Sequence, residues 1–133
     1  MGAMKKKVNG YGGESYRFWC GGCSTHHSYR TKACDPALLP ADMEEKWKRY
    51  HLGGPVWQFD GNEESPTFSP SLLVSHSRYL KDAEGEFIPR GDGGLEVEKV
   101  RCHLYLRKGM VQYLGDCSHS LAGQTVPVEP ERF

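Results

Sequence analysis

Hydrophobic and polar residues alternate along much of the chain, which is the period of a strand with one buried face. The clearest unit is a hairpin over residues 96–117, in which Lys108 and Gly109 separate two alternating segments. Shorter alternating runs predict four further strands, at residues 15–19, 28–31, 56–59 and 71–77. We therefore expect a mainly antiparallel β structure.

One segment has helical rather than alternating spacing. Met43, Trp47 and Tyr50 recur at i, i+4 and i+7, and two glycines follow. This pattern predicts a helix over residues 41–52 whose apolar stripe is a packing face. Residues 81–94 are charged and rich in glycine, which predicts an exposed excursion. The expected fold is a small α+β domain with one prominent helix.

The composition implies a thin core. The chain has 133 residues, with 16 glycines, 8 prolines and 38% hydrophobic residues, so it suits one domain made of short elements. A protein with such a core usually needs a disulfide or a metal ion to stabilise its fold. We place the single domain at residues 5–133, because residues 1–4 read Met-Gly-Ala-Met, which resembles a vector remnant that runs up to a native Met4.

Charge and hydropathy exclude two classes of partner. The chain has 17 basic and 17 acidic residues, and this balance lacks the basic footprint of a general nucleic-acid binder. No apolar run approaches the roughly 18 residues of a membrane span, and there is no signal-peptide h-region. We expect a cytoplasmic protein. In that reducing compartment, paired cysteines are more often metal ligands or redox groups than disulfides.

Four of the five cysteines predict a zinc site. Cys20 and Cys23 form a CxxC knuckle whose two intervening glycines free the backbone to direct both thiolates at one ion. In the hairpin, a two-residue turn sends Cys102 and Cys117 to the same, apolar face. Together these residues predict a structural zinc ion held by four cysteines.

Other interpretations of the cysteines stay open. Cys102 and Cys117 would also suit buried apolar positions. CxxC pairs occur in redox sites, although no thioredoxin-like βαβ pattern surrounds this one. His119 lies two residues after Cys117, which in a strand would point both side chains to the same face. His27 follows the knuckle by four residues. Either histidine could therefore replace a cysteine ligand. Cys34 has no obvious partner.

The opposite face of the hairpin is largely polar and carries candidate catalytic groups. The same parity places His103 and Asp116 there, at a diagonal spacing that would allow an imidazole–carboxylate contact if the register were slightly shifted. A solvated histidine beside a surface aspartate would have the same spacing. A nucleophile could come from the segment PTFSPS, in which prolines fix the backbone around Ser69 and Ser71. The alternative is a rigid edge segment whose serines satisfy backbone groups.

These motifs together resemble a small phage and bacterial family. The resemblance covers residues 18–128, and its motifs are WQFDGN at 57–62, PTFSPS at 66–71, Cys102-His103 and DCSHSLAGQTV at 116–126. The family is mostly catalogued as a domain of unknown function. Some members carry the label of ammonia monooxygenase, which does not suit a chain without a membrane span. This sequence differs from shorter members by insertions at residues 34–52 and before residue 96.

The resemblance implies zinc binding and, more loosely, a role beside bacterial ubiquitin-like conjugation systems. A serine-type peptidase or isopeptidase that processes a ubiquitin-like protein would suit that setting. In it Ser71, or Ser69 as the fallback, would be the nucleophile; His103 or His119 would be the general base, and Asp116 would orient it. The alternatives are a non-catalytic zinc-binding module of a phage or antiviral-defence assembly, and a zinc metallohydrolase with histidine ligands and an open site for water.

Overall fold

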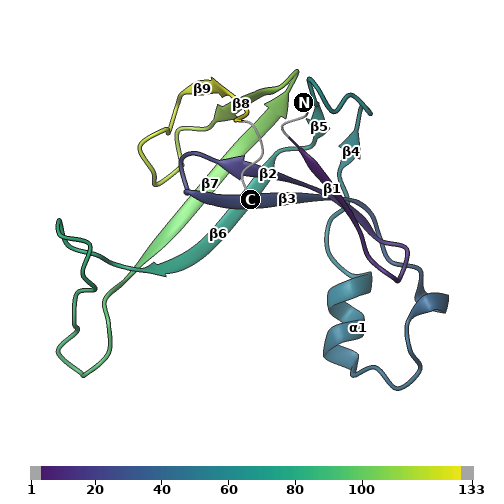
Figure 1. Cartoon of the computed structure of the whole chain (residues 1–133), viewed down its shortest axis with the longest axis horizontal. Coiled ribbons are helices and arrows are strands. Elements are labelled where there is room, and N and C mark those ends of the chain that lie inside the picture. The colour runs from purple at the N-terminus through teal and green to yellow at the C-terminus, as the bar shows by residue number, and fades with distance from the viewer. Residues whose placement is uncertain (1–3, 130–133) are drawn as a thin grey trace.

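The computed structural model describes residues 4–129, which form three antiparallel sheets and one α-helix (Figure 1). The first sheet contains, in order, β1 (Lys5–Val8), β2 (Glu14–Cys20) and β3 (Thr25–Lys32). The smallest sheet pairs β4 (Gln58–Phe59) with β5 (Phe68–Ser69). The third contains, in order, β6 (Leu72–Tyr79), β7 (Val97–Arg107), β8 (Met110–Tyr113) and β9 (Thr125–Pro127). The predicted mainly antiparallel α+β class is confirmed.

The core lies between the inner faces of the first and third sheets. Its largest fully buried side chains come from both sheets and from β5; among them are Phe18, Tyr29, Phe68, Leu104, Leu106, Val111 and Tyr113. Phe68 stacks against Tyr29 on one side and Phe59 on the other, with ring centroids 4.2 and 4.6 Å apart. The small sheet is therefore anchored in the core just before Ser71.

The β7–β8 hairpin has the predicted register. Arg107 pairs with Met110 around Lys108 and Gly109, which both have positive φ, as a two-residue turn of the I′ type requires. Because side chains alternate along a strand, the even-numbered residues of β7 from 100 to 106 are buried, and the odd-numbered ones face outward.

The helix differs from its prediction. α1 spans Glu45–Leu52, four residues shorter than expected, and it buries no residue. Trp47 is 50% exposed and Tyr50 65%, so the prediction of a packing face is wrong. The physical reason is placement, because α1 projects away from the sheets (Figure 1). It is attached near its C-terminus, where Arg30 of β3 donates hydrogen bonds to the carbonyls of Tyr50 and Gly53.

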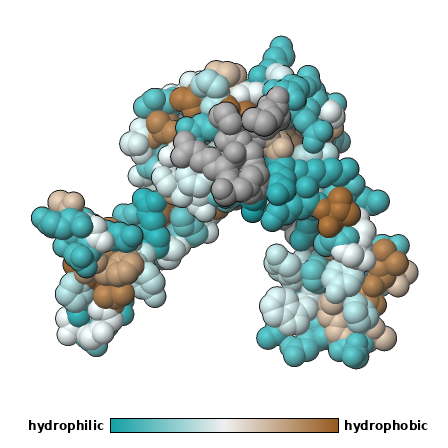
Figure 2. Space-filling view, in the orientation of Figure 1, coloured by the Kyte–Doolittle hydropathy of each residue, from teal (hydrophilic) through white to brown (hydrophobic). Residues whose placement is uncertain are grey.

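A second projection is formed by the chain between β6 and β7. The predicted excursion at residues 81–94 is an arm with two antiparallel bridges, Lys81 to Phe87 and Pro89 to Leu95. Figure 2 shows hydrophobic residues on the surface of both projections. Phe87 in the arm is 49% exposed.

Two terminal features complete the description. Residues 1–3 of the expected leader lie outside the described residues, whereas Met4 is buried in the core cluster. β1 follows at Lys5–Val8; the sequence pattern did not predict it, because all four of its residues are exposed. A short 3-10 helix (Pro36–Leu38) precedes α1. No helix in residues 4–129 is long and apolar enough to cross a membrane.

Candidate functional site

Three polar side chains meet on the outer face of the third sheet. The Nε2 atom of His103 in β7 lies 3.2 Å from the Oγ atom of Ser71. The Nδ1 atom of the same ring lies 3.2 Å from Oδ2 of Asp116. Ser71 immediately precedes β6, and Asp116 lies in the turn after β8. This hydroxyl–imidazole–carboxylate order is the arrangement by which serine hydrolases activate an alcohol.

Several contacts hold Ser71 in place. Its carbonyl oxygen accepts a hydrogen bond of 3.1 Å from the indole Nε1 of Trp57. Further upstream, backbone N–H groups in the turn of the β7–β8 hairpin donate to the carbonyl of Pro66 and the hydroxyl of Thr67, at 2.9 and 2.8 Å. The PTFSPS segment is thus fastened to the same hairpin that carries His103. The sequence placed Trp57 in the predicted strand at residues 56–59 and suggested no contact with Ser71; the N–H group of a partly buried indole, which needs a partner, was the available signal.

Asp116 also contacts an arginine. Arg101 Nε lies 3.2 Å from Asp116 Oδ2, the same oxygen that contacts His103. The backbone N–H of Ser118 donates to the Arg101 carbonyl, and the backbone N–H of Arg101 donates to the Ser118 hydroxyl; these two bonds hold the Asp116 turn against β7. The carboxylate is therefore fixed from two sides. By the alternation of the hairpin, Arg101 shares the polar face with His103, but the sequence suggested no role for it.

The other two candidate catalytic residues lie elsewhere. Ser69 is exposed in β5, opposite Gln58, and none of the hydrogen bonds found in residues 4–129 joins it to a histidine. The Nε2 atom of His119 lies 3.3 Å from the Sγ atom of Cys102, on the inner side of the sheet. The structure thus brings Ser71, His103 and Asp116 together and leaves Ser69 and His119 apart from them.

A cluster of metal-ligating side chains lies on the inner face of the same sheet. The ligand atoms of Cys20, Cys23, His27 and Cys102 all lie within 4.8 Å of one another, and all four residues are buried. The sulfurs of Cys20 and Cys102 are 3.8 Å apart. Two Zn–S bonds of about 2.3 Å at a tetrahedral angle would place sulfurs about 3.8 Å apart. His27 Nε2 is buried and has no hydrogen-bond partner among the described residues. This donor set fits one zinc ion.

The cluster connects the two large sheets. Cys20 ends β2, His27 lies in β3, and Cys102 lies in β7. Between the knuckle cysteines, position 22 requires glycine, because a Cβ atom there would overlap the ring of His119. The close approach of this ring explains why the tight knuckle carries no side chain at that position.

Cys117 belongs to a second, overlapping group. Its ligand atom lies within 4.8 Å of those of Cys102 and His119. Its Sγ atom also lies 3.3 Å from the backbone nitrogen and 3.2 Å from the carbonyl oxygen of His103. The structure therefore groups His27, rather than Cys117, with the other three predicted ligands. A ligand role for Cys117 stays a prediction.

The electrostatics of the cluster suit a cation. The pKa of Cys20 is lowered, mainly by the hydrogen bond that it accepts from Cys102. The same hydrogen bond is the main cause that raises the pKa of Cys102. Burial raises the pKa of Tyr113, whose hydroxyl lies 3.2 Å from Cys20 Sγ. Burial lowers the pKa of His119, which favours the neutral imidazole that metals bind. A divalent cation can bind such a cluster by displacing the thiol protons.

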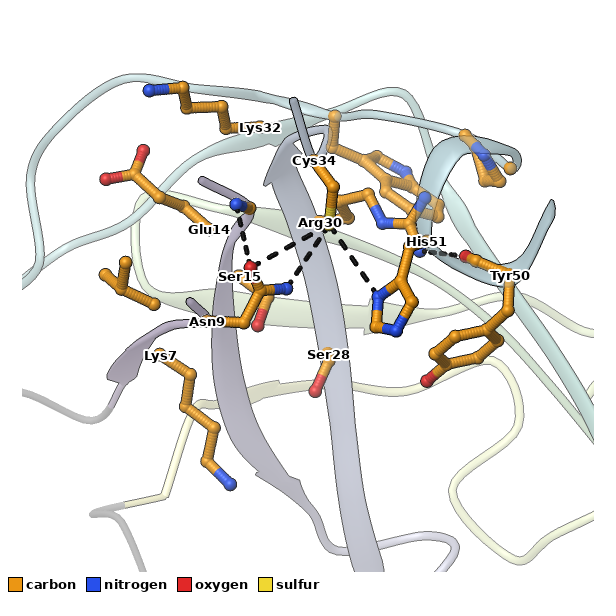
Figure 3. Close-up of a pocket in the computed structure, with 15 residues that line it drawn as sticks. Lys7, Asn9, Glu14, Ser15, Ser28, Arg30, Lys32, Cys34, Tyr50 and His51 are labelled. Atoms are coloured by element: carbon orange, nitrogen blue, oxygen red, sulfur yellow. Dashed lines mark hydrogen bonds between the residues drawn. The ribbon is translucent and has the colours of Figure 1, made fainter. Parts of the chain in front are cut away.

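The fifth cysteine lines a separate cavity of about 570 Å³ at the other end of the first sheet (Figure 3). Contrary to the sequence interpretation, Cys34 has partners. Its Sγ atom accepts a hydrogen bond of 3.3 Å from Asn9 and lies 3.8 Å from Nδ1 of His51. The inserted helix supplies His51, and this explains why the sequence pattern did not reveal the contact.

Comparisons with known proteins give one finding. A family model described as "Bacterial ubiquitination-like system serine protease (BubE)" matches residues 3–114. The matched region includes Ser71, His103 and the CxxC knuckle, and it ends two residues before Asp116. Comparisons with curated proteins and with solved structures give no match.

Proposed function

The chain belongs to the BubE family of bacterial ubiquitination-like system serine proteases, and from this premise we propose that it is a serine peptidase or isopeptidase that processes a ubiquitin-like protein in the bacterial cytoplasm. The observation that carries the proposal is the continuous chain of contacts from the Ser71 hydroxyl through His103 to Asp116. An alcohol becomes nucleophilic when a positioned base removes its proton, and this geometry supplies such a base.

The reaction would have two steps. In the first, His103 Nε2 accepts the proton of Ser71 Oγ, which attacks the carbonyl carbon of the scissile amide. The same imidazole then protonates the departing amine, the C–N bond breaks, and an ester to Ser71 remains. In the second step, His103 removes a proton from water, which attacks the ester carbonyl carbon. The bond from that carbon to Ser71 Oγ then breaks, His103 returns the proton to Ser71 Oγ, and the acid is released. Asp116 keeps the imidazole in the productive tautomer and stabilises its charged form.

The metal would be structural in this mechanism. Cys20, Cys23, His27 and Cys102 would hold zinc, and a closed site of this kind contributes folding energy by linking elements. Two observations favour this role over a metallohydrolase. The four ligands are at most 5% exposed, whereas the Ser71–His103–Asp116 group lies on the opposite, solvent-facing side of the sheet. A substrate on that side reaches the serine and not the metal.

The test combines cleavage with direct labelling. Wild-type protein should cleave a C-terminally extended ubiquitin-like protein of the same bacterial system and should react with a fluorophosphonate probe at Ser71, located by peptide mass spectrometry. Ser71→Ala should abolish both reactions without changing the zinc content or the melting temperature. Ser69→Ala is the matched control and should retain both. Loss of labelling in Ser69→Ala, or full cleavage by Ser71→Ala, would contradict the assignment. A wild-type protein that neither cleaves nor labels would instead favour a non-catalytic zinc-binding module.

A further inference from the structure

β6 begins one residue after Ser71, and it is the first strand of its sheet. The order of the sheet is β6-β7-β8-β9, so one edge of β6 has no neighbouring strand among residues 4–129. Edge strands present backbone N–H and C=O groups to which an extended peptide can add as a further strand. Which groups are free depends on how β6 pairs with β7.

The pairing identifies Leu73 and Ser75 as the residues whose backbone groups face the open edge. Leu73 pairs with His103 and Ser75 with Arg101. The carbonyl of His103 accepts from Leu114, and the backbone of Arg101 bonds Ser118, so both point away from β6. Residues opposite each other in an antiparallel pair exchange both hydrogen bonds or neither. Leu73 and Ser75 therefore direct their N–H and C=O groups out of the sheet, toward the open edge.

Each end of this free stretch has a boundary. At the near end, the carbonyl of Ser71 is already bonded to Trp57. At the far end, the Arg78 side chain donates to the carbonyl of Cys23 at 3.4 Å and pairs with Glu98. The stretch between these boundaries, residues 72–77, has room for about six residues of extended peptide, because a paired strand has the same rise per residue.

A groove of about 540 Å³ follows the same edge on the inner side of the sheet. One wall is formed by the even-numbered side chains of β6, Val74, His76 and Arg78, and the other by the knuckle and the start of β3. The buried Nε2 atom of His76 has no hydrogen-bond partner among the described residues. An added strand would thus direct alternate side chains into this groove and onto the outer face, where Leu73 is 52% exposed.

We propose that the open edge of β6 binds the extended C-terminal tail of the ubiquitin-like substrate as an additional β-strand, and so delivers its scissile carbonyl to Ser71. This inference rests on the proposed function. The peptide that occupies the edge lies on the acyl side of the cleaved bond, because a ubiquitin-like tail joins its target through its own C-terminal carboxyl group. Backbone pairing would supply affinity, and the groove beside His76 would select alternate side chains.

The experiment isolates one backbone N–H group. Ser75→Pro removes the outward N–H, and proline is tolerated on an edge strand where that group faces solvent. Ser75→Ala removes the same hydroxyl and keeps the N–H. We expect kcat/KM for the C-terminally extended ubiquitin-like protein to be about tenfold lower for Ser75→Pro than for Ser75→Ala, since one hydrogen bond in a desolvated site contributes about that factor. Equal values for the two folded variants would overturn the proposal.

A second measurement does not depend on proline being accommodated or on catalysis. Amide hydrogen exchange of the Ser71→Ala protein is followed by NMR, alone and with the mature ubiquitin-like protein, whose tail is intact. The Leu73 and Ser75 amides should exchange at least about tenfold more slowly in the complex, and a tail-deleted ubiquitin-like protein should not protect them. Binding without protection at these two amides would overturn the edge-strand proposal. A wild-type enzyme that fails to cleave, but whose Ser71→Ala variant shows protection, would overturn the proposed catalysis and support the edge.

Discussion

Cys102 and His103 are consecutive residues of β7, and their side chains belong to different sites on opposite faces of the sheet. Cys102 is fully buried in the metal-ligating cluster, whereas His103 contacts Ser71 and Asp116 on the outer face. Asp116 and Cys117 repeat the relationship: Asp116 contacts His103, and Cys117 belongs to the second metal-ligating group, with Cys102 and His119. Because one backbone supplies both sites, an ion that fixes Cys102 also fixes the position from which His103 reaches Ser71.

The first prediction concerns the stability that the metal supplies. Cys20→Ser should release zinc and lower the melting temperature by more than about 10 °C, because an ion held by this cluster would link β2, β3 and β7. Zinc per chain is measured by elemental analysis, and unfolding by circular dichroism. Cys34→Ser is the matched control, since Cys34 lies outside both metal-ligating groups. A Cys20→Ser protein that keeps one zinc and its native melting temperature would contradict the cluster.

The second prediction identifies the fourth ligand. His27→Ala should lower zinc affinity by at least about tenfold, because the orphaned Nε2 of His27 is the donor grouped with Cys20, Cys23 and Cys102. Cys117→Ser should retain about one zinc per chain. Competition with a chromogenic chelator measures both affinities. The reverse result, with zinc retained in His27→Ala and lost in Cys117→Ser, would restore the set of four cysteines expected from the sequence.

The third prediction addresses the carboxylate. Asp116→Asn should lower kcat by about 10²- to 10⁴-fold, because an amide no longer favours the imidazole tautomer that accepts a proton from Ser71. Zinc content should stay at the wild-type value, since the Asp116 side chain is on the face away from the cluster. Steady-state kinetics and elemental analysis check the two parts. Wild-type kcat in Asp116→Asn would remove this residue from the mechanism.

The hairpin shows how much of the candidate site follows from sequence. A two-residue turn and strict alternation are local properties, so parity alone assigns Cys102 to one face and His103 to the other. The same register places Asp116 diagonal to His103, and the turn after β8 brings the carboxylate into contact with the ring. The CxxC knuckle is equally local. These features need no knowledge of how the sheets pack.

Other features depend on tertiary placement, which periodicity does not encode. The stripe of α1 has the spacing of a packing face, yet Trp47 is half exposed because the helix projects from the body. Spacing after the knuckle made His27 a candidate ligand, but its place beside Cys102 depends on the first and third sheets sharing one core, which no spacing rule predicts. The carbonyl contact of Trp57 with Ser71 joins two segments whose relation appears only in the folded chain.

The last prediction tests whether Trp57 positions the nucleophile. Trp57→Phe keeps an aromatic ring against the core but removes the N–H group that bonds the Ser71 carbonyl at 3.1 Å. Without this bond, the residue before β6 can shift, and small displacements of a reacting group cost much of the rate. We expect kcat to fall about tenfold or more with a smaller change in KM.

The stability cost of Trp57→Phe should be modest, about 1 kcal/mol for the lost hydrogen bond, as measured by urea unfolding. Trp47→Phe is the matched control, because Trp47 is 50% exposed on α1 and has no contact with Ser71. It should leave kcat and stability unchanged. If Trp57→Phe changes stability alone, the indole is a packing residue only. If it lowers kcat while the protein remains folded and zinc-loaded, the hydrogen bond to the Ser71 carbonyl holds the serine within reach of His103.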